Sequence, residues 1–124
     1  MSAEKLVDEW VRLYNDQDFR GLASMYTDDV TYACGPFGLV FAGRDAFVEH
    51  VQEYGRAVPD RKLTVTRIIG EGAVIAVEYD FAGTSSGLLP VLPAAGEPIS
   101  TTFCTVLQLR GGRIAGQEDY LGGR

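Results

Sequence analysis

The 124-residue sequence has one histidine, two cysteines and no long apolar run. A lone histidine, His50, excludes a metal site built from several histidines. Cys34 and Cys104 form neither a disulfide framework nor a metal-ligand cluster, which favours a reducing compartment. No stretch approaches the roughly 20 apolar residues of a membrane-spanning helix, and the amino terminus lacks the pattern of a secretory signal. We therefore expect a cytoplasmic protein with no metal and no membrane partner.

Positive charge is also scarce, because 11 lysines and arginines face 17 acidic residues and give a net charge of −6. That balance argues against nucleic acid as a partner and weakly favours a neutral or cationic small molecule. The segment Gly83–Gly87 lacks the lysine and spacing of a phosphate-binding loop, so we expect no cofactor. The length and the 46% hydrophobic content predict one compact domain over residues 1–124.

The first half of the chain predicts three helices and a strand. Ser2 can cap a first helix, and Asp18 a short second helix that extends to Tyr26. A third helix opens at Gly43, and His50 lies beside its buried stripe, where a histidine is more often a packing residue than a catalyst. The apolar positions that define the buried faces are Leu6, Val7, Trp10, Val11, Leu13 and Tyr14, then Phe19, Leu22 and Met25, then Phe47, Val51 and Tyr54.

The second half predicts a sheet. Strands are expected over residues 39–42, 63–69, 73–81 and 99–109, in addition to an earlier strand in which Val30, Tyr32 and Cys34 share one side. In the strand 73–81, alternation separates Tyr79 and its apolar neighbours from Glu78 and Asp80. Either the aromatic face is the core and the carboxylates are solvated, or the carboxylates point into a cavity and the aromatic face binds another subunit.

The last strand follows a tight Gly111-Gly112 turn. Alternation places Asp119 among small and apolar neighbours, a setting that can raise the pKa of a carboxyl group. The alternative interpretation is a solvated carboxylate at a strand end. The two predicted faces are Ile114, Gly116, Glu118 and Tyr120 on one side, and Ala115, Gln117, Asp119 and Leu121 on the other.

The segments 14–32 and 109–121 together resemble the beginning and end of SnoaL-like and limonene-epoxide-hydrolase-like proteins. These families belong to the superfamily of ketosteroid isomerase and nuclear transport factor 2. The resemblance implies an α+β cone, with three N-terminal helices packed on a strongly curved, mostly antiparallel sheet around an apolar pocket. It also implies a homodimer that forms through the open face of the sheet.

The resemblance implies roles for individual residues as well. Asp119 matches the carboxylate that helps to activate a water in the epoxide hydrolases, and Tyr32 matches a water-holding tyrosine. Asp80 matches their general acid, but Glu78 stands where they carry an arginine. The apolar loop 81–99 resembles that of SnoaL-like cyclases, except that Ser85 replaces a histidine.

These observations predict a cofactor-independent general acid–base enzyme acting on a small hydrophobic oxygenated metabolite. A SnoaL-like cyclase or isomerase is favoured, and the alternatives are an epoxide hydrolase and a non-catalytic binding or dimerisation module. Asp119 is the predicted base, Asp80 the acid and Tyr32 the orienting group. The candidate substrate-binding residues are Trp10, Tyr14, Cys34, His50, Glu78, Leu88, Leu92 and Gln117.

Overall fold

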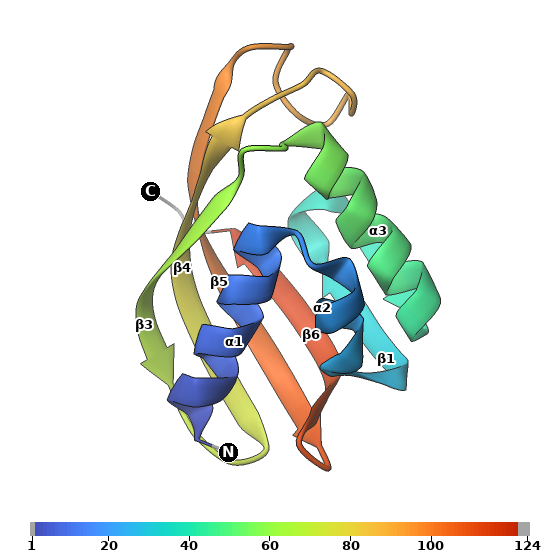
Figure 1. Ribbon diagram of the computed structural model, residues 1–124, viewed down its shortest axis with the longest axis vertical. Coiled ribbons are helices and arrows are strands. Elements are labelled where there is room, and N and C mark those ends of the chain that lie inside the picture. The colour runs from blue at the N-terminus through green and yellow to red at the C-terminus, as the bar shows by residue number, and fades with distance from the viewer. Residues whose placement is uncertain (1, 122–124) are drawn as a thin grey trace.

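The computed structural model describes residues 2–121 and has three α-helices packed on one face of a curved, unclosed six-stranded sheet (Figure 1). This confirms the predicted α+β architecture. No helix among the described residues is long and apolar enough to cross a membrane. The elements are α1 (Ala3–Asp16), α2 (Phe19–Ser24), β1 (Tyr26–Cys34), the short 3-10 helix η1 (Gly35–Phe37), β2 (Leu39–Ala42), α3 (Arg44–Ala57), β3 (Lys62–Ile69), β4 (Val74–Thr84), β5 (Pro98–Arg110) and β6 (Arg113–Leu121).

The strand order is β2-β1-β6-β5-β4-β3, so the first and last strands of the chain are neighbours. The β1–β6 pair is parallel and the other pairs are antiparallel. In this register Tyr32 lies opposite Gln117, and Cys34 lies opposite Asp119. The topology therefore brings together candidate residues that are 85 positions apart in the sequence.

The helix caps form as predicted, because Ser2 accepts a hydrogen bond from the amide of Lys5 and Asp18 accepts one from the amide of Gly21. However, α2 ends at Ser24, so Tyr26 begins β1 instead of ending the helix. The reason is tertiary: the amide of Ile114 donates to the carbonyl of Met25 at 2.8 Å, and β6 thereby draws the chain into the sheet directly after α2.

A bulge in β6 changes the predicted alternation. Leu109 pairs with Ile114, but the preceding residue Gln108 pairs with Gly116, which leaves Ala115 as an extra residue. Ile114 and Gln117 are consequently both buried, at 0% and 2% exposure. The prediction that Ile114 lies on the face opposite Gln117 was wrong, because a bulge reverses the side-chain direction after it.

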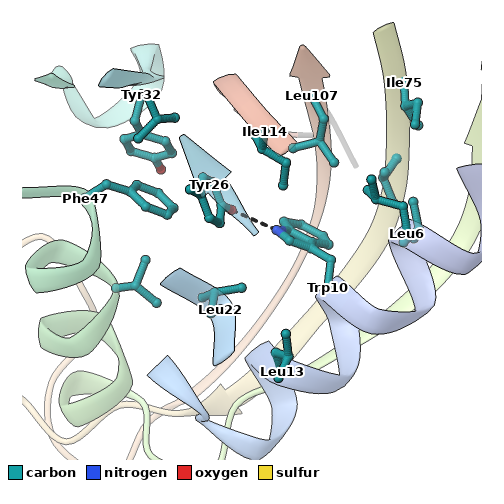
Figure 2. Packing of buried hydrophobic residues seen from close by; sticks show 14 of the residues in the cluster. Leu6, Trp10, Leu13, Leu22, Tyr26, Tyr32, Phe47, Ile75, Leu107 and Ile114 are labelled. Carbon is teal, nitrogen blue, oxygen red and sulfur yellow. Dashed lines mark hydrogen bonds between the residues drawn. The ribbon is translucent and has the colours of Figure 1, made fainter. Parts of the chain in front are cut away.

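The core occupies the space between α1 and the concave face of the sheet. Trp10 is fully buried there, and its indole Nε1 donates to the hydroxyl of Tyr26 at 2.9 Å (Figure 2). Figure 2 also shows Phe47 and Tyr32 beside Tyr26, where α3 closes over the sheet. A packed aromatic core of this kind holds the strands that carry the site in fixed positions.

Candidate functional site

A cavity of about 130 Å³ lies next to this core. Its walls are mostly aromatic and aliphatic, with a few polar side chains among them, which is the usual composition of a small-molecule site. Within residues 2–121, no cluster of histidine, cysteine and acidic side chains is placed to hold a metal ion. The cavity is lined by Tyr14, Tyr32, Cys34, Phe37, Leu39, Phe47, His50, Val51, Tyr54, Val58, Arg61, Leu63, Tyr79, Phe81, Leu92, Ile99, Thr101, Phe103, Asp119 and Leu121.

Asp119 carries a carboxylate that accepts three side-chain hydrogen bonds at the cavity wall. The hydroxyl of Tyr32 donates to Oδ2 at 2.6 Å. The hydroxyl of Thr105 and the amide of Gln117 donate to Oδ1 at 2.8 and 3.2 Å. Since a carboxylate oxygen can accept about two hydrogen bonds, Oδ2 is the atom that retains capacity for a proton or a ligand.

A second layer of side chains fixes the direction of these hydrogen bonds. Thr105 has one hydroxyl proton and donates it to Asp119, so the hydroxyl of Tyr79, 2.9 Å away, donates to Thr105. Tyr26 donates to the side-chain carbonyl of Gln117 at 2.5 Å, which leaves the amide of Gln117 to donate to Asp119. Every donor in the network is thus directed toward the carboxylate, which is the arrangement of a preorganised anionic group.

Burial raises the pKa of Asp119 above its ordinary value, and the hydrogen bonds from Tyr32, Thr105 and Gln117 offset part of that rise. The pKa of the Tyr32 phenol is also raised well above its ordinary value, because of burial and the nearby negative charge of Asp119. Tyr32 therefore keeps its proton, while Asp119 becomes a stronger base than a solvated carboxylate.

His50 lines the cavity as part of an aromatic cluster. Its ring centroid is 5.1 Å from that of Tyr32, 4.9 Å from that of Phe41 and 4.6 Å from that of Tyr54. Burial, followed by the positive charge of Arg61, lowers the pKa of His50 to about 4. His50 is therefore neutral at pH 7 and borders the interior, as the sequence predicts.

Three further candidates also line the cavity: Tyr14, Cys34 and Leu92. Burial and the charge of Asp119 raise the pKa of the Cys34 thiol, so this cysteine is a packing residue and not an activated nucleophile. Burial and then Asp119 raise the pKa of Tyr14 to about 12, although the charge of Arg61 opposes the rise. Tyr14 therefore keeps its proton and can donate it to a ligand.

The structure places Asp80 and Glu78 outside the cavity. Ile75, Val77 and Tyr79 are buried on the inner face of β4, whereas Asp80 is exposed and Glu78 forms an ion pair with Arg67 on β3. The carboxylates are thus the solvated side of the strand. The assignment of Asp80 as the general acid and of Glu78 as a substrate contact was wrong, and the epoxide hydrolase alternative loses the acid it requires.

Leu88, Trp10 and Gln117 do not line the cavity either. Trp10 and Gln117 are buried behind Asp119 and act through the hydrogen-bond network. Leu88 is 54% exposed, because Ser85 fixes the path of the loop by donating to the carbonyl of Pro93 and accepting from the amide of Gly87. This path directs Leu92 into the cavity wall and leaves Leu88 in solvent.

Arg61 is a cavity residue that the sequence reasoning missed. It is only 6% exposed, and among residues 2–121 no group accepts a hydrogen bond from its buried Nε and Nη2 atoms. Its guanidinium carbon lies 5.2 Å from the ring centroid of Tyr14 and 5.9 Å from that of Phe19. Alternation from the buried Leu63 places Arg61 on the inner face, and that signal could have identified it.

Comparison with known proteins places the fold in a family. Residues 7–117 match the sequence profile of the SnoaL-like domain, and Asp119 lies just beyond the matched segment. Comparison with curated proteins gives no significant match. AclR, a proposed hydroxylase from Streptomyces galilaeus, has a similar structure, with a TM-score of 0.81 at 21% identity over 98% of this chain and 75% of that chain.

Two proposed polyketide cyclases are also similar in structure. The one from Xanthomonas campestris pv. campestris gives a TM-score of 0.82 at 23% identity, over 97% of this chain and 90% of that chain. The SnoaL-like one from Shewanella denitrificans gives 0.84 at 14% identity, over 96% and 89%. At these identities the similar structures show only a common fold. The family is shown by the profile match, which covers residues 7–117. The chain therefore belongs to the SnoaL-like family.

Proposed function

We propose that this protein is a cofactor-free enzyme of the cyclase or isomerase type, in which Asp119 is the general base. The observation that carries the proposal is the carboxylate of Asp119, which has a raised pKa and accepts three hydrogen bonds in a largely apolar cavity. Burial makes such a group a competent base, and the surrounding donors hold it in one geometry. The substrate class is a small hydrophobic carbonyl compound.

The reaction begins with proton transfer from a carbon atom next to a carbonyl group to Oδ2 of Asp119. The electrons of the broken C–H bond form an enolate, which attacks a second carbonyl of the same molecule and closes a ring. The alkoxide that results takes the proton back from Asp119, so that no atom is gained or lost. In a substrate without a second carbonyl, return of the proton to a different carbon gives an isomer.

Two tyrosines assist this sequence. Tyr32 donates to Asp119 at 2.6 Å and positions the carboxylate. Tyr14 lines the same cavity and keeps its proton at neutral pH because its pKa is about 12. Since Asp80 lies outside the cavity, Tyr14 takes over the role of donating a hydrogen bond to the enolate oxygen.

A non-catalytic binding module is the alternative, and it is favoured by the absence of two residues of the related enzymes, the arginine replaced by Glu78 and the histidine replaced by Ser85. A simple binder, however, has no need of a carboxylate within hydrogen-bonding distance of a buried tyrosine. Asp119 and Tyr32 are in that arrangement, with Tyr32 only 5% exposed. This pairing favours the enzyme.

The proposal can be tested without the natural substrate. We expect the protein to accelerate deuterium exchange at C3 of 4-oxo-4-phenylbutanamide in D₂O, followed by NMR, because C3 is adjacent to the ketone. Asp119→Asn should reduce the acceleration about 10²- to 10⁴-fold, the usual contribution of a general base. The control Asp80→Asn removes one carboxylate from the exposed face of β4 and should leave the rate unchanged. Equal rates for Asp119→Asn and the wild type would refute the proposal.

We also propose that two copies associate through the outer face of the sheet. Ile69, Val74 and Tyr120 are large apolar side chains on three strands of this sheet and are 45%, 54% and 47% exposed. Exposed apolar groups of this kind favour a protein contact. Sedimentation at micromolar concentration should give a dimer in the wild type and a shift toward monomer in Tyr120→Lys. A wild-type protein that sediments only as a monomer would contradict this proposal.

A further inference from the structure

Arg61 is a buried positive charge that forms no ion pair with the described residues. Its Nε and Nη2 atoms have no hydrogen-bond partner among the described residues. Within the same residues, its guanidinium makes cation–π contacts with the rings of Tyr14 and Phe19. Burying a guanidinium without hydrogen bonds is unfavourable, and the observed cation–π contacts recover only part of the loss. The ion pairs elsewhere in residues 2–121 all involve more exposed arginines, namely Arg12, Arg44, Arg67 and Arg110.

The chain on both sides of Arg61 is fixed in place. Asp60 accepts a hydrogen bond from the amide of Thr84 on β4 at 2.7 Å. Asn15 on α1 bonds both the amide and the carbonyl of Leu63, at 2.8 and 3.1 Å. These hydrogen bonds fix the backbone around Arg61, but none of them involves its guanidinium group. A charged side chain positioned in this way is typical of a site preorganised for a ligand.

Asp119 does not serve as the counterion of Arg61. No ion pair joins them within 4.0 Å, and the oxygens of Asp119 already accept hydrogen bonds from three other side chains. Both charges act on the pKa of Tyr14, because Asp119 raises it and Arg61 lowers it. The two charged groups therefore occupy separate parts of one cavity, and Tyr14 lies within the influence of each.

We infer that Arg61 binds a carboxylate of the ligand, so that the substrate is a hydrophobic keto acid whose ketone end reaches Asp119. The inference uses the cavity of the proposed function, but the binding step requires no catalysis. A guanidinium is planar and matches the two oxygens of a carboxylate, and the resulting charge-assisted hydrogen bonds are stronger than those to a neutral carbonyl. The net charge of −6 pointed toward a neutral or cationic ligand, but the local charge at this wall of the cavity is positive.

The test compares 4-oxo-4-phenylbutanoate with 4-oxo-4-phenylbutanamide, which differ only in the charge of one end. Isothermal titration of the wild type should show the acid binding about 10- to 100-fold more tightly, as expected for hydrogen bonds to a charged group. Arg61→Met should remove this preference, and Arg61→Lys should retain part of it. Arg56→Met is the matched control, because Arg56 is exposed at the end of α3 and its loss changes the net charge by the same amount.

Thermal stability distinguishes a ligand-binding role of Arg61 from a purely structural one. Because the buried Nε and Nη2 of Arg61 have no partner among residues 2–121, ligand-free Arg61→Met should have a higher melting temperature than the wild type, whereas Arg56→Met should not. A lower melting temperature together with equal wild-type binding of acid and amide would make Arg61 a structural residue and overturn the inference.

The Asp119→Asn variant distinguishes failure of the inference from failure of the proposed function. This variant should still prefer the acid, since the binding group is intact, even though deuterium exchange is lost. Exchange that depends on Asp119 without any preference for the acid would refute the role of Arg61 alone. A preference for the acid without exchange in the wild type would refute only the proposed function.

Discussion

The two charged groups of the cavity, Asp119 and Arg61, differ in the hydrogen bonds that the surrounding protein supplies to them. Asp119 receives three hydrogen bonds from side chains on β1, β5 and β6. Arg61 is also enclosed by the fold, but its Nε and Nη2 donate no hydrogen bond to any of the described residues. A charge whose partners are supplied by the protein is maintained in the empty site, whereas a charge without partners gains them only when a ligand arrives. This difference is consistent with chemistry at the first group and recognition at the second.

The largest expected effect is kinetic: substitution of Asp119 should change mainly kcat, and substitution of Arg61 should change mainly KM. With a keto acid as substrate, Asp119→Asn should reduce kcat about 10²- to 10⁴-fold with little change in affinity, because the base acts in the transition state. Arg61→Met should raise KM about 10- to 100-fold and leave kcat nearly unchanged, because a remote carboxylate is bound equally in both states. Steady-state kinetics on the two variants measures both quantities. The comparison fails if Arg61→Met lowers kcat as much as Asp119→Asn.

The sequence predicts Tyr32 and Asp119 as separate site candidates, both through the family resemblance and Asp119 also through its setting in the last strand. The hydrogen bond between them is known only from the structure. The sequence could not decide whether Asp80 faces inward. Alternation shows only which residues of β4 share a face, and the direction of that face depends on the helices that cover it. The sheet turns Tyr79 inward and exposes Asp80.

Two other features, the bulge at Ala115 and the burial of Arg61, were not predicted from the pattern of apolar and polar residues along the chain. The bulge at Ala115 depends on how β6 pairs with β5, so the burial of Ile114 could not be read from β6 alone. Arg61 was missed for a different reason: charged residues are almost always placed at the surface, and that expectation outweighed its alternation with Leu63. An exception to a strong rule of this kind is most informative when, as here, it lies in a cavity.

Next in size is the pH dependence of stability caused by His50, which lies at the cavity wall within reach of the charge of Arg61. Its pKa is about 4 in the folded protein, below the ordinary 6.5. The unfolded chain therefore binds the proton more readily, so stability is full above pH 6.5 and falls as the pH decreases toward 4. The loss amounts to at most about 3 kcal/mol, and solvent screening at the partly exposed ring reduces it. Urea unfolding at intervals from pH 7 to pH 4 should show this decline, and His50→Phe should reduce it; identical slopes would contradict the assignment.

A smaller effect concerns one donor to Asp119. Tyr32→Phe removes the only side-chain hydrogen bond to Oδ2 from the described residues, and this bond stabilises the charged form of the carboxylate. The pKa of Asp119 should therefore rise further. In the pH profile of deuterium exchange, the acidic limb should move to higher pH by about 1–2 pH units if the bond is typical of those to a charged group. Thr105→Val, which removes one of the two donors to Oδ1, provides the matched comparison and should shift the limb in the same direction.

The smallest effect is the contribution of Asp119 itself to stability, since burial and hydrogen bonding act against each other there. Its pKa in the folded protein is raised, so the folded state binds the proton more tightly than the unfolded chain. The contribution is therefore full below about pH 3.8, the value in the unfolded chain, and is lost as the pH rises through the folded pKa. This slope is opposite in sign to that of His50. It is best measured in a His50→Phe background, where Asp119→Asn should flatten the remaining acid-stabilised slope. A slope that persists after Asp119→Asn would mean that another carboxyl group, and not the one at the centre of the network, carries the raised pKa.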